Sequence, residues 1–324
     1  MRCFSVYSVN SGQQHLKSGR ACDDAAFAAS VKDCRAVAVC DGAGSRKYAR
    51  EGARIASRIS ALYMSANFDE LYSMPDGRCG AAVLYIVRRA LCDEADKLGC
   101  GVRELGSTLM ACAVHDDGRS IVLHIGDGVI DRLGEDGSLS VLSEYDHDIA
   151  ENVTELTTTA DASVREYKSR KRCIYMMYTD GAEPVFSVPD IGRHLLSLAL
   201  LLSEKRFIDE CSELFKVPDD STVAVTGDIS LIDTVVSSAA DKAVLSMLFG
   251  ISDKAVCSRR RYYGRVLAAA ADHPCTIREM IRLTRQHSAA RTKKKLSPLI
   301  KCGLLEYDNG YFTLTRAQSL RRLA

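Results

Sequence analysis

The sequence predicts a layered α+β protein followed by a small winged helix-turn-helix domain. Short runs of small and β-branched residues are separated by hairpin-type turns such as DDGR and GEDG. Helix-like stretches stand in groups between these runs and do not follow every strand, which favours antiparallel layers over a parallel α/β sheet. Towards the end of the chain the pattern changes to helices and one last short hairpin. We therefore expect two structural units of different kinds.

The first unit, residues 1–228, is expected to consist of hairpin-connected strands with helices grouped between them. Helical patterns are expected at 47–64, 79–98 and 189–215, where apolar residues recur with a helical period. The expected strands are rich in small, β-branched or aromatic residues and are bounded by polar turns. They cover residues 3–9, 25–31, 34–40, 107–115, 120–127, 129–133, 139–142, 173–181 and 219–228.

The second unit, residues 258–324, follows a mixed and partly helical connecting segment at 229–257. A helix is expected in YYGRVLAAAADH. Thr276 then stands three residues before Glu279, the spacing of a capping box at the start of the next helix. A third helix is expected at 288–302, and the DNG turn predicts a hairpin after it. Helices in this order followed by a hairpin are the winged variant of a helix-turn-helix.

Composition limits the class of protein. The chain has 324 residues, 47% of them hydrophobic and 26% charged, which is enough for two domains with a sizeable core. No apolar run is long enough for a secretion signal or a membrane span, which predicts a cytoplasmic protein without a membrane partner. The 13 cysteines are odd in number and form no CxxC pair. This pattern indicates neither a disulfide framework nor a zinc knuckle, and it favours a reducing compartment.

Charge is distributed unevenly along the chain. The formal net charge of the whole chain is only +1, but residues 255–324 contain 15 Lys and Arg against 4 Asp and Glu. The remainder holds 28 basic and 38 acidic residues. An acidic front and a basic tail predict two domains with different partners.

Aspartates recur at the turns and strand ends of the first unit. A single Asp-Gly after a strand, such as Asp41 and Gly42, is an ordinary turn signal. The recurrence is harder to explain by turns alone, because carboxylates gathered in space repel one another unless a cation neutralises them. Oxygen ligands without histidine or thiolate favour Mg²⁺ or Mn²⁺, and two such ions can act together on a phosphate group. The aspartates concerned are Asp23, Asp24, Asp41, Asp127, Asp180, Asp219 and Asp220.

The order and wording of these motifs resemble the metal-dependent serine/threonine phosphatases of type 2C, and most closely their bacterial branch. The motifs are HLKSGRACDDAAFA, VAVCDGAGSRKYAREGARIAS, LGSTLMACAV with LHIGDGVI, YMMYTDGAEPVF and DDSTVAVT, in this order over residues 5–228. The resemblance implies a four-layer αββα sandwich of two antiparallel sheets. It also implies hydrolysis of phosphoserine and phosphothreonine by a metal-activated water at a dinuclear Mn²⁺ or Mg²⁺ centre, with a phosphorylated protein as substrate and a cognate kinase as partner.

The resemblance also assigns roles to individual residues. Asp41 would bridge both ions, and the Gly42 carbonyl would hold the second. Asp180 and Asp219 would complete the first site. Asp23 stands near the second ion and Asp24 in its inner or outer shell, while Asp127 matches the ligand of a third, weaker ion in those members that have one. These assignments make Asp41, Asp180 and Asp219 the expected catalytic centre.

The chain departs from the family pattern at three positions. Ala43 replaces the histidine that many animal members carry two residues after the bridging aspartate, so the general acid is unidentified. The phosphate-binding arginine of the family has two candidates here, Arg20 and Lys17. Asp23 is one methylene shorter than the usual glutamate. The lone histidines His15 and His124 are interpreted as structural, and Asp146, His147 and Asp148 as a solvated loop.

The basic tail has two alternative partners. Arg291, Lys293, Lys294 and Lys295 lie on or beside the expected third helix, where they could contact the phosphates of DNA. Runs of lysine and arginine are also common on solvated faces, and a winged helix can dock a protein instead. An alternative function is therefore a phosphorylation-linked regulator that has a weak or inactive phosphatase-like sensor and a DNA-binding tail.

Overall fold

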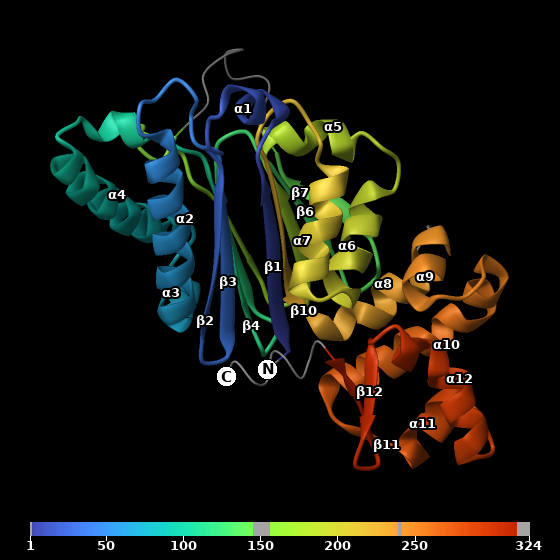
Figure 1. The fold of residues 1–324 in the computed structure, drawn as a ribbon. Coiled ribbons are helices and arrows are strands. Elements are labelled where there is room, and N and C mark those ends of the chain that lie inside the picture. The colour runs from blue at the N-terminus through green and yellow to red at the C-terminus, as the bar shows by residue number, and fades with distance from the viewer. Residues whose placement is uncertain (1, 145–155, 239–241, 316–324) are drawn as a thin grey trace.

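Two antiparallel five-stranded sheets form the centre of the protein (Figure 1). A computed structural model describes residues 2–144, 156–238 and 242–315. The first sheet has the order β1-β10-β9-β6-β7, from Cys3–Asn10, Ser221–Asp228, Ile174–Tyr178, Val129–Leu133 and Leu139–Ser143. The second has the order β2-β3-β4-β5-β8, from Ala25–Val31, Cys34–Cys40, Leu109–His115, Ser120–Ile125 and Arg165–Ser169.

Helices cover the outer face of each sheet. α2 (Ala49–Ala66), α3 (Phe68–Ser73) and α4 (Arg78–Leu98) share one hydrophobic cluster with the second sheet. α6 (Ile191–Leu201) and α7 (Glu204–Leu214) share another with the first sheet. A third cluster fills the space between the two sheets. The predicted four-layer αββα sandwich is therefore confirmed.

Strand β3 shows why some strands lack polar alternation. Its sequence CRAVAVC is buried along its whole length. Ala36 and Ala38 belong to the cluster under the helices, whereas Val37 and Val39 belong to the cluster between the sheets. Because successive side chains point to opposite faces, a strand between two apolar layers needs apolar residues on both faces, which positions 36–40 of β3 provide.

Several elements differ from the sequence expectation. α1 (Gln13–Ser18) and β8 were not predicted, and the expected helix at 189–215 is two helices separated by Leu202 and Ser203. Ser203 caps α7 by accepting a hydrogen bond from the Arg206 N–H. β8 has the polar sequence REYKS because it is an edge strand, half-buried and paired only with β5 among the described strands. Short helical turns complete the unit at Val102–Leu105 (η1), Asp180–Ala182 (η2), Glu183–Phe186 (α5) and Ile229–Leu231 (η3).

The C-terminal part contains the helices and hairpin that the sequence predicts. α10 (Asp253–Asp272), α11 (Ile277–Thr284) and α12 (Ala289–Lys301) accompany a three-stranded sheet of order β11-β13-β12. Its strands are Cys275–Thr276, Tyr311–Leu314 and Leu305–Asp308. The predicted capping box is present, since Thr276 and Glu279 bond reciprocally. Assignment of this part to the winged-helix class stays a prediction.

The hydrophobic core is continuous between the two units. The expected connecting segment contains α8 (Ile232–Ser238), α9 (Lys242–Phe249) and the first residues of α10. α8 packs closely on α10, where a side chain on Gly264 would collide with Asp233. One continuous hydrophobic cluster runs from Phe4 in β1 through these helices to Leu314 in β13. The C-terminal part is therefore anchored to the first sheet through its own core.

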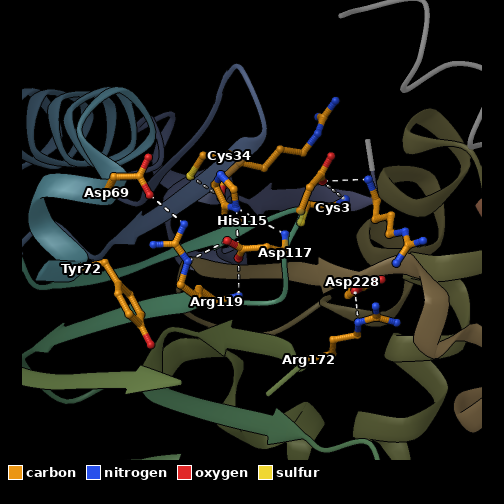
Figure 2. A network of polar contacts seen from close by, with 12 residues as sticks. Cys3, Cys34, Asp69, Tyr72, His115, Asp117, Arg119, Arg172 and Asp228 are labelled. Carbon is orange, nitrogen blue, oxygen red and sulfur yellow. Dashed lines mark hydrogen bonds and ion pairs between the residues drawn. The ribbon is translucent and has the colours of Figure 1, made fainter. Parts of the chain in front are cut away.

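A polar network closes one end of the sandwich (Figure 2). Arg119 pairs with Asp117 and Asp69 and lies over the Tyr72 ring. The Asp116 carboxylate accepts backbone N–H bonds from Arg2, just before β1, and from Cys3, its first residue. This end carries the β4–β5 turn and the start of β1, so the opposite end of the strands is left for the candidate site.

Two further expectations concern membrane spans and a loop. Among the described residues, no helix combines the length and apolar character needed to cross a membrane. The loop expected at Asp146, His147 and Asp148 lies outside the described residues.

Candidate active site

The ends of several strands converge on one cavity of about 490 Å³. β3 ends at it, β2, β4 and β10 begin beside it, and the turns after β5 and β9 complete it. Six carboxylates, two arginines and a histidine supply most of its polar groups. It is lined by His15, Arg20, Asp23, Asp41, Gly42, Ala43, Gly44, Ser45, Arg46, Thr108, Asp127, Leu156, Asp180, Asp219 and Asp220.

The backbone holds Asp41 at the lip of the core. The Asp41 N–H donates to the Thr108 hydroxyl at 2.9 Å, and the Thr108 N–H donates back to the Asp41 carbonyl at 2.9 Å. Gly42 next to it forms a β-bridge with Ser107. A Cβ at Gly42 would lie 2.6 Å from the Asp23 carbonyl oxygen, so only glycine lets these two acidic segments approach. The Asp-Gly of this motif is thus a close-packing requirement as well as a turn.

Asp24 lies beneath Asp41 and does not line the cavity. Its carboxyl accepts a hydrogen bond from the Thr179 hydroxyl at 3.0 Å and shares another with Asp41. Burial raises the pKa of Asp24. Asp24 therefore supports Asp41 from below.

The Asp180 and Asp219 segments meet through a second glycine. A Cβ at Gly181 would collide with the backbone carbonyl of Asp220. The Gly181 N–H donates to the Asp180 carboxylate at 2.7 Å, and the Asp220 N–H donates to Asp219 at 2.9 Å. This close approach carries both carboxylates to the same cavity.

The cavity fits divalent cations. Carboxylate oxygens of Asp41, Asp127 and Asp180 lie within 4.8 Å of one another. Burial raises the pKa of Asp41, and the charges of Asp24 and Asp180 raise it further. Burial likewise raises the pKa of Asp180, together with the charge of Asp127. Such mutual repulsion is relieved when cations bind among the carboxylates. An all-oxygen donor set suits hard ions such as Mg²⁺ or Mn²⁺.

A second acidic group comprises His15, Asp23 and Asp220. Asp220 is buried and accepts bonds from the Gly12 N–H at 2.7 Å and the Asp23 N–H at 2.6 Å. His15 Nδ1 lies 2.8 Å from Oδ2 of Asp220, the oxygen that also accepts the Asp23 N–H bond. Asp220 therefore ties α1 and the start of β2 to the loop before β10.

Arg20 and Lys17, the two candidates for the phosphate-binding residue, differ in their position relative to the cavity. Arg20 lines the cavity, and its Nη2 lies 3.4 Å from the Asp23 carboxylate. Lys17 is exposed on α1 and does not line the cavity. Arg46, which the sequence analysis did not select, lines it as well.

Most carboxylates chosen from the sequence meet in the structure. Three further titratable lining residues had been given no role at the site: His15 was expected to be structural, Asp220 was named only among the recurring aspartates, and Arg46 was not considered. The DDST run did signal Asp220, but nothing local signalled the other two. His124 is buried, as expected for a structural histidine.

The sequence profile of the family described as Protein phosphatase 2C matches residues 11–226. The chain belongs to the protein phosphatase 2C family. The matched span contains every cavity-lining residue and ends within β10. The protein is therefore a metal-dependent serine/threonine phosphatase, a hydrolase that acts on phosphoproteins.

Solved structures agree with this protein phosphatase 2C fold. A bacterial serine phosphatase with one arginine substituted has a TM-score of 0.51 and 15% identity, covering 69% of this chain and 97% of that one. The serine/threonine phosphatase Stp1 from Staphylococcus aureus has a TM-score of 0.50 and 12% identity, covering 70% and 95%. The comparison with curated proteins gave no match. At these identities the structural likeness concerns the fold alone.

Proposed function

We propose that this phosphatase hydrolyses phosphoserine and phosphothreonine in proteins with two divalent ions held at the cavity. The observation that carries the proposal is the convergence of six carboxylates from the ends of five strands on one cavity. Asp41, Asp180 and Asp219 would hold the first ion, and Asp41, the Gly42 carbonyl and Asp23 the second. Asp127 would contribute to a third, weaker ion. When bound, Mn²⁺ or Mg²⁺ supplies positive charge that polarises water and neutralises a phosphate.

Other residues of the chain position the carboxylates and offer a positive charge to the phosphate. Thr108 fixes the Asp41 backbone, and Asp24 holds its carboxyl from below. Arg20 at the cavity wall offers a guanidinium to phosphate oxygens. The Gly12 and Asp23 N–H bonds to Asp220 keep three loops in register. Because these supports come from distant segments, the cavity is organised before a substrate enters.

The test measures hydrolysis of a phosphothreonine peptide with Mn²⁺, with chelator, and by Asp41→Asn. We expect hydrolysis only with metal and a loss of at least about 100-fold in the variant, because the bridging carboxylate loses its charge. Thermal unfolding gives a second readout: Mn²⁺ should raise the midpoint of the natural protein and not that of the variant. A folded natural protein that binds Mn²⁺ but hydrolyses no phosphopeptide would support the inactive-sensor alternative.

A specific observation favours a second function for the tail. Exposed cations on α11, at its C-cap and on α12 comprise Arg278, Arg282, Arg285, Arg291, Lys293, Lys294 and Lys301. The only carboxylate on these two helices is Glu279, which is engaged in the capping box. Helices α11 and α12 lie away from α1 and from the end of the sandwich that α1 covers (Figure 1). We infer that this basic surface contacts phosphates of duplex DNA, with a winged helix as the binding fold.

Side-chain exposure determines which basic residues of α12 are available to contact DNA. Lys295 is half-buried, its ammonium lies 4.3 Å from the Tyr262 ring centre, and it donates to the Thr284 carbonyl. Lys293 and Lys294 are exposed, with Lys293 over the Tyr307 ring. Arg291 is exposed in the first turn of α12. The DNA proposal therefore rests on Arg291, Lys293 and Lys294 and leaves Lys295 out.

Retention on duplex DNA at increasing salt distinguishes DNA binding from protein docking. The triple change Arg291→Gln, Lys293→Gln and Lys294→Gln should flatten the logarithmic salt slope by about 3, one phosphate per cation. A control with Lys47→Gln, Arg50→Gln and Arg78→Gln removes the same charge from exposed positions of the catalytic part. Equal loss in both triple variants, or no salt-dependent retention at all, would point to protein docking instead.

A further inference from the structure

Arg46 is a cation of the cavity that the roles above leave unused. It lines the same cavity as the carboxylates, and its Nε is buried without a hydrogen-bond partner among the described residues. A guanidinium N–H removed from water requires an acceptor, and an unpaired one is costly. Among the described residues, this N–H of Arg46 is therefore left for an acceptor that enters the cavity.

The loop that carries Arg46 is fixed to the rest of the protein. The Arg46 N–H donates to the Ala43 carbonyl at 2.8 Å, closing a tight turn directly after the Asp41 motif. The Ala43 N–H donates to the Gly106 carbonyl at 3.1 Å, and the Tyr48 N–H donates to the Glu104 carbonyl at 3.0 Å. Both ends of the loop are thus attached to η1 and the residue after it. This attachment keeps Arg46 beside the cavity.

Of the two arginines that line the cavity, only Arg20 forms an ion pair with a described carboxylate. Arg20 lies 3.4 Å from the Asp23 carboxylate, and 58% of its side chain is exposed. Arg46 is only partly exposed and makes no ion pair with a described carboxylate. Of the two guanidinium groups, that of Arg46 is therefore the one left to meet an incoming anion.

We propose that Arg46 binds an oxygen of the substrate phosphoryl group and retains the same contact with the product phosphate. This inference rests on the proposed phosphatase function for its substrate. The planar guanidinium can offer two parallel N–H donors to two phosphate oxygens, which an ammonium cannot do. Arg46 then acts from the wall formed by the Asp41 loop, and Arg20 from the wall formed by the segment between α1 and β2.

The test combines direct binding with kinetics. Equilibrium dialysis of radiolabelled inorganic phosphate against Mg²⁺-loaded protein measures phosphate binding without turnover. Arg46→Gln should weaken this binding by about tenfold or more, and should raise KM for a phosphothreonine peptide in parallel. Arg46→Lys should recover only part of the binding, because the lysine offers no fork. Lys47→Gln is the matched control, since Lys47 is exposed, adjacent and outside the cavity lining.

The outcomes separate this inference from the proposed function. Phosphate binding and KM unchanged in Arg46→Gln, with hydrolysis intact, would overturn the role of Arg46 and leave the phosphatase function standing. Arg46-dependent phosphate binding without hydrolysis by the natural protein would uphold the anion site and overturn the phosphatase function. If Arg46→Gln fails to fold, the folded Arg46→Lys variant decides: binding equal to that of the natural protein would contradict a bidentate contact.

Discussion

At the scale of single residues, His124 shows how an ionisable group is kept neutral by the core. It lies in β5 with no exposed surface, and its Nδ1 is 2.8 Å from the Ser143 hydroxyl. Its Nε2 is buried and has no hydrogen-bond partner in the part of the chain that the structure describes. Burial, aided by the charge of Arg165, lowers the pKa of His124 to about 3. The unfolded chain takes up a proton at this residue near pH 6.5, whereas the folded chain does not.

This difference predicts a loss of stability in acid. Between pH 6.5 and pH 3 the unfolded state binds more protons, so the free energy of unfolding falls as the pH falls. His124 alone should cost about 2 kcal/mol between pH 7 and pH 5. Urea unfolding at both pH values should show a shallower pH dependence for His124→Gln than for the natural protein. The exposed His287→Gln serves as the control, and equal slopes in all three proteins would contradict the prediction.

Residue by residue, the acids of the site could be predicted because each belongs to a short local motif. Asp41, Asp180 and Asp219 each stand beside a strand end that the sequence marks clearly. Arg46 and His15 could not be predicted. The direction of Arg46 depends on bonds from its loop to Glu104 and Gly106, far along the chain. The place of His15 depends on α1 and on its pairing with Asp220.

At the scale of elements, the site depends on how closely the strand-end loops approach one another. Gly181, in the turn after β9, touches the carbonyl of Asp220 where β10 begins. A methyl group at position 181 has no space unless the two loops separate. Because Asp180 and Asp219 lie on these loops, the separation would move two carboxylates at once.

Gly181→Ala should therefore lose metal binding before it loses the fold. We expect Mn²⁺ to raise the thermal unfolding midpoint of the natural protein and to leave that of Gly181→Ala nearly unchanged, with hydrolysis reduced by at least about tenfold. Gly101→Ala is the control, because a Cβ there meets no atom within 4 Å. A normal Mn²⁺ response in Gly181→Ala would show that the loops can separate without disturbing the ligands.

Elements with strong local signals could be predicted, and those without could not. The capping box at Thr276 and Glu279 and the apolar strand β3 are examples of the first kind. The edge strand β8 is an example of the second, since its polar sequence takes strand form only by pairing with β5. α1 is short, and its first two N–H groups donate to the carbonyls of Val217 and Pro218. Pairing and anchoring of this kind are tertiary effects that local propensity does not contain.

At the scale of the whole molecule, the two units share a core although their surfaces suit different partners. Helices α11 and α12, which carry the basic surface, lie far from α1 (Figure 1), whereas His15 of α1 lines the acidic cavity. The hydrophobic cluster of the first sheet nevertheless continues through Val236 in α8 and Leu267 in α10 to Phe312 in β13. The uneven charge of the sequence predicted two surfaces, but it gave no sign of this shared core.

A shared core predicts one cooperative unfolding transition for the described parts of both units. Leu267→Ala, which removes a fully buried side chain from α10, should cost about 2–5 kcal/mol. Hydrogen exchange measured peptide by peptide should then accelerate in the slowest strands of the first sheet as well as in α11 and α12. Met247→Ala, at a position 57% exposed, should change neither. If only α10 to β13 exchanged faster, the tail would be an independent folding unit, and a ligand bound to its basic surface could not stabilise the phosphatase through the core.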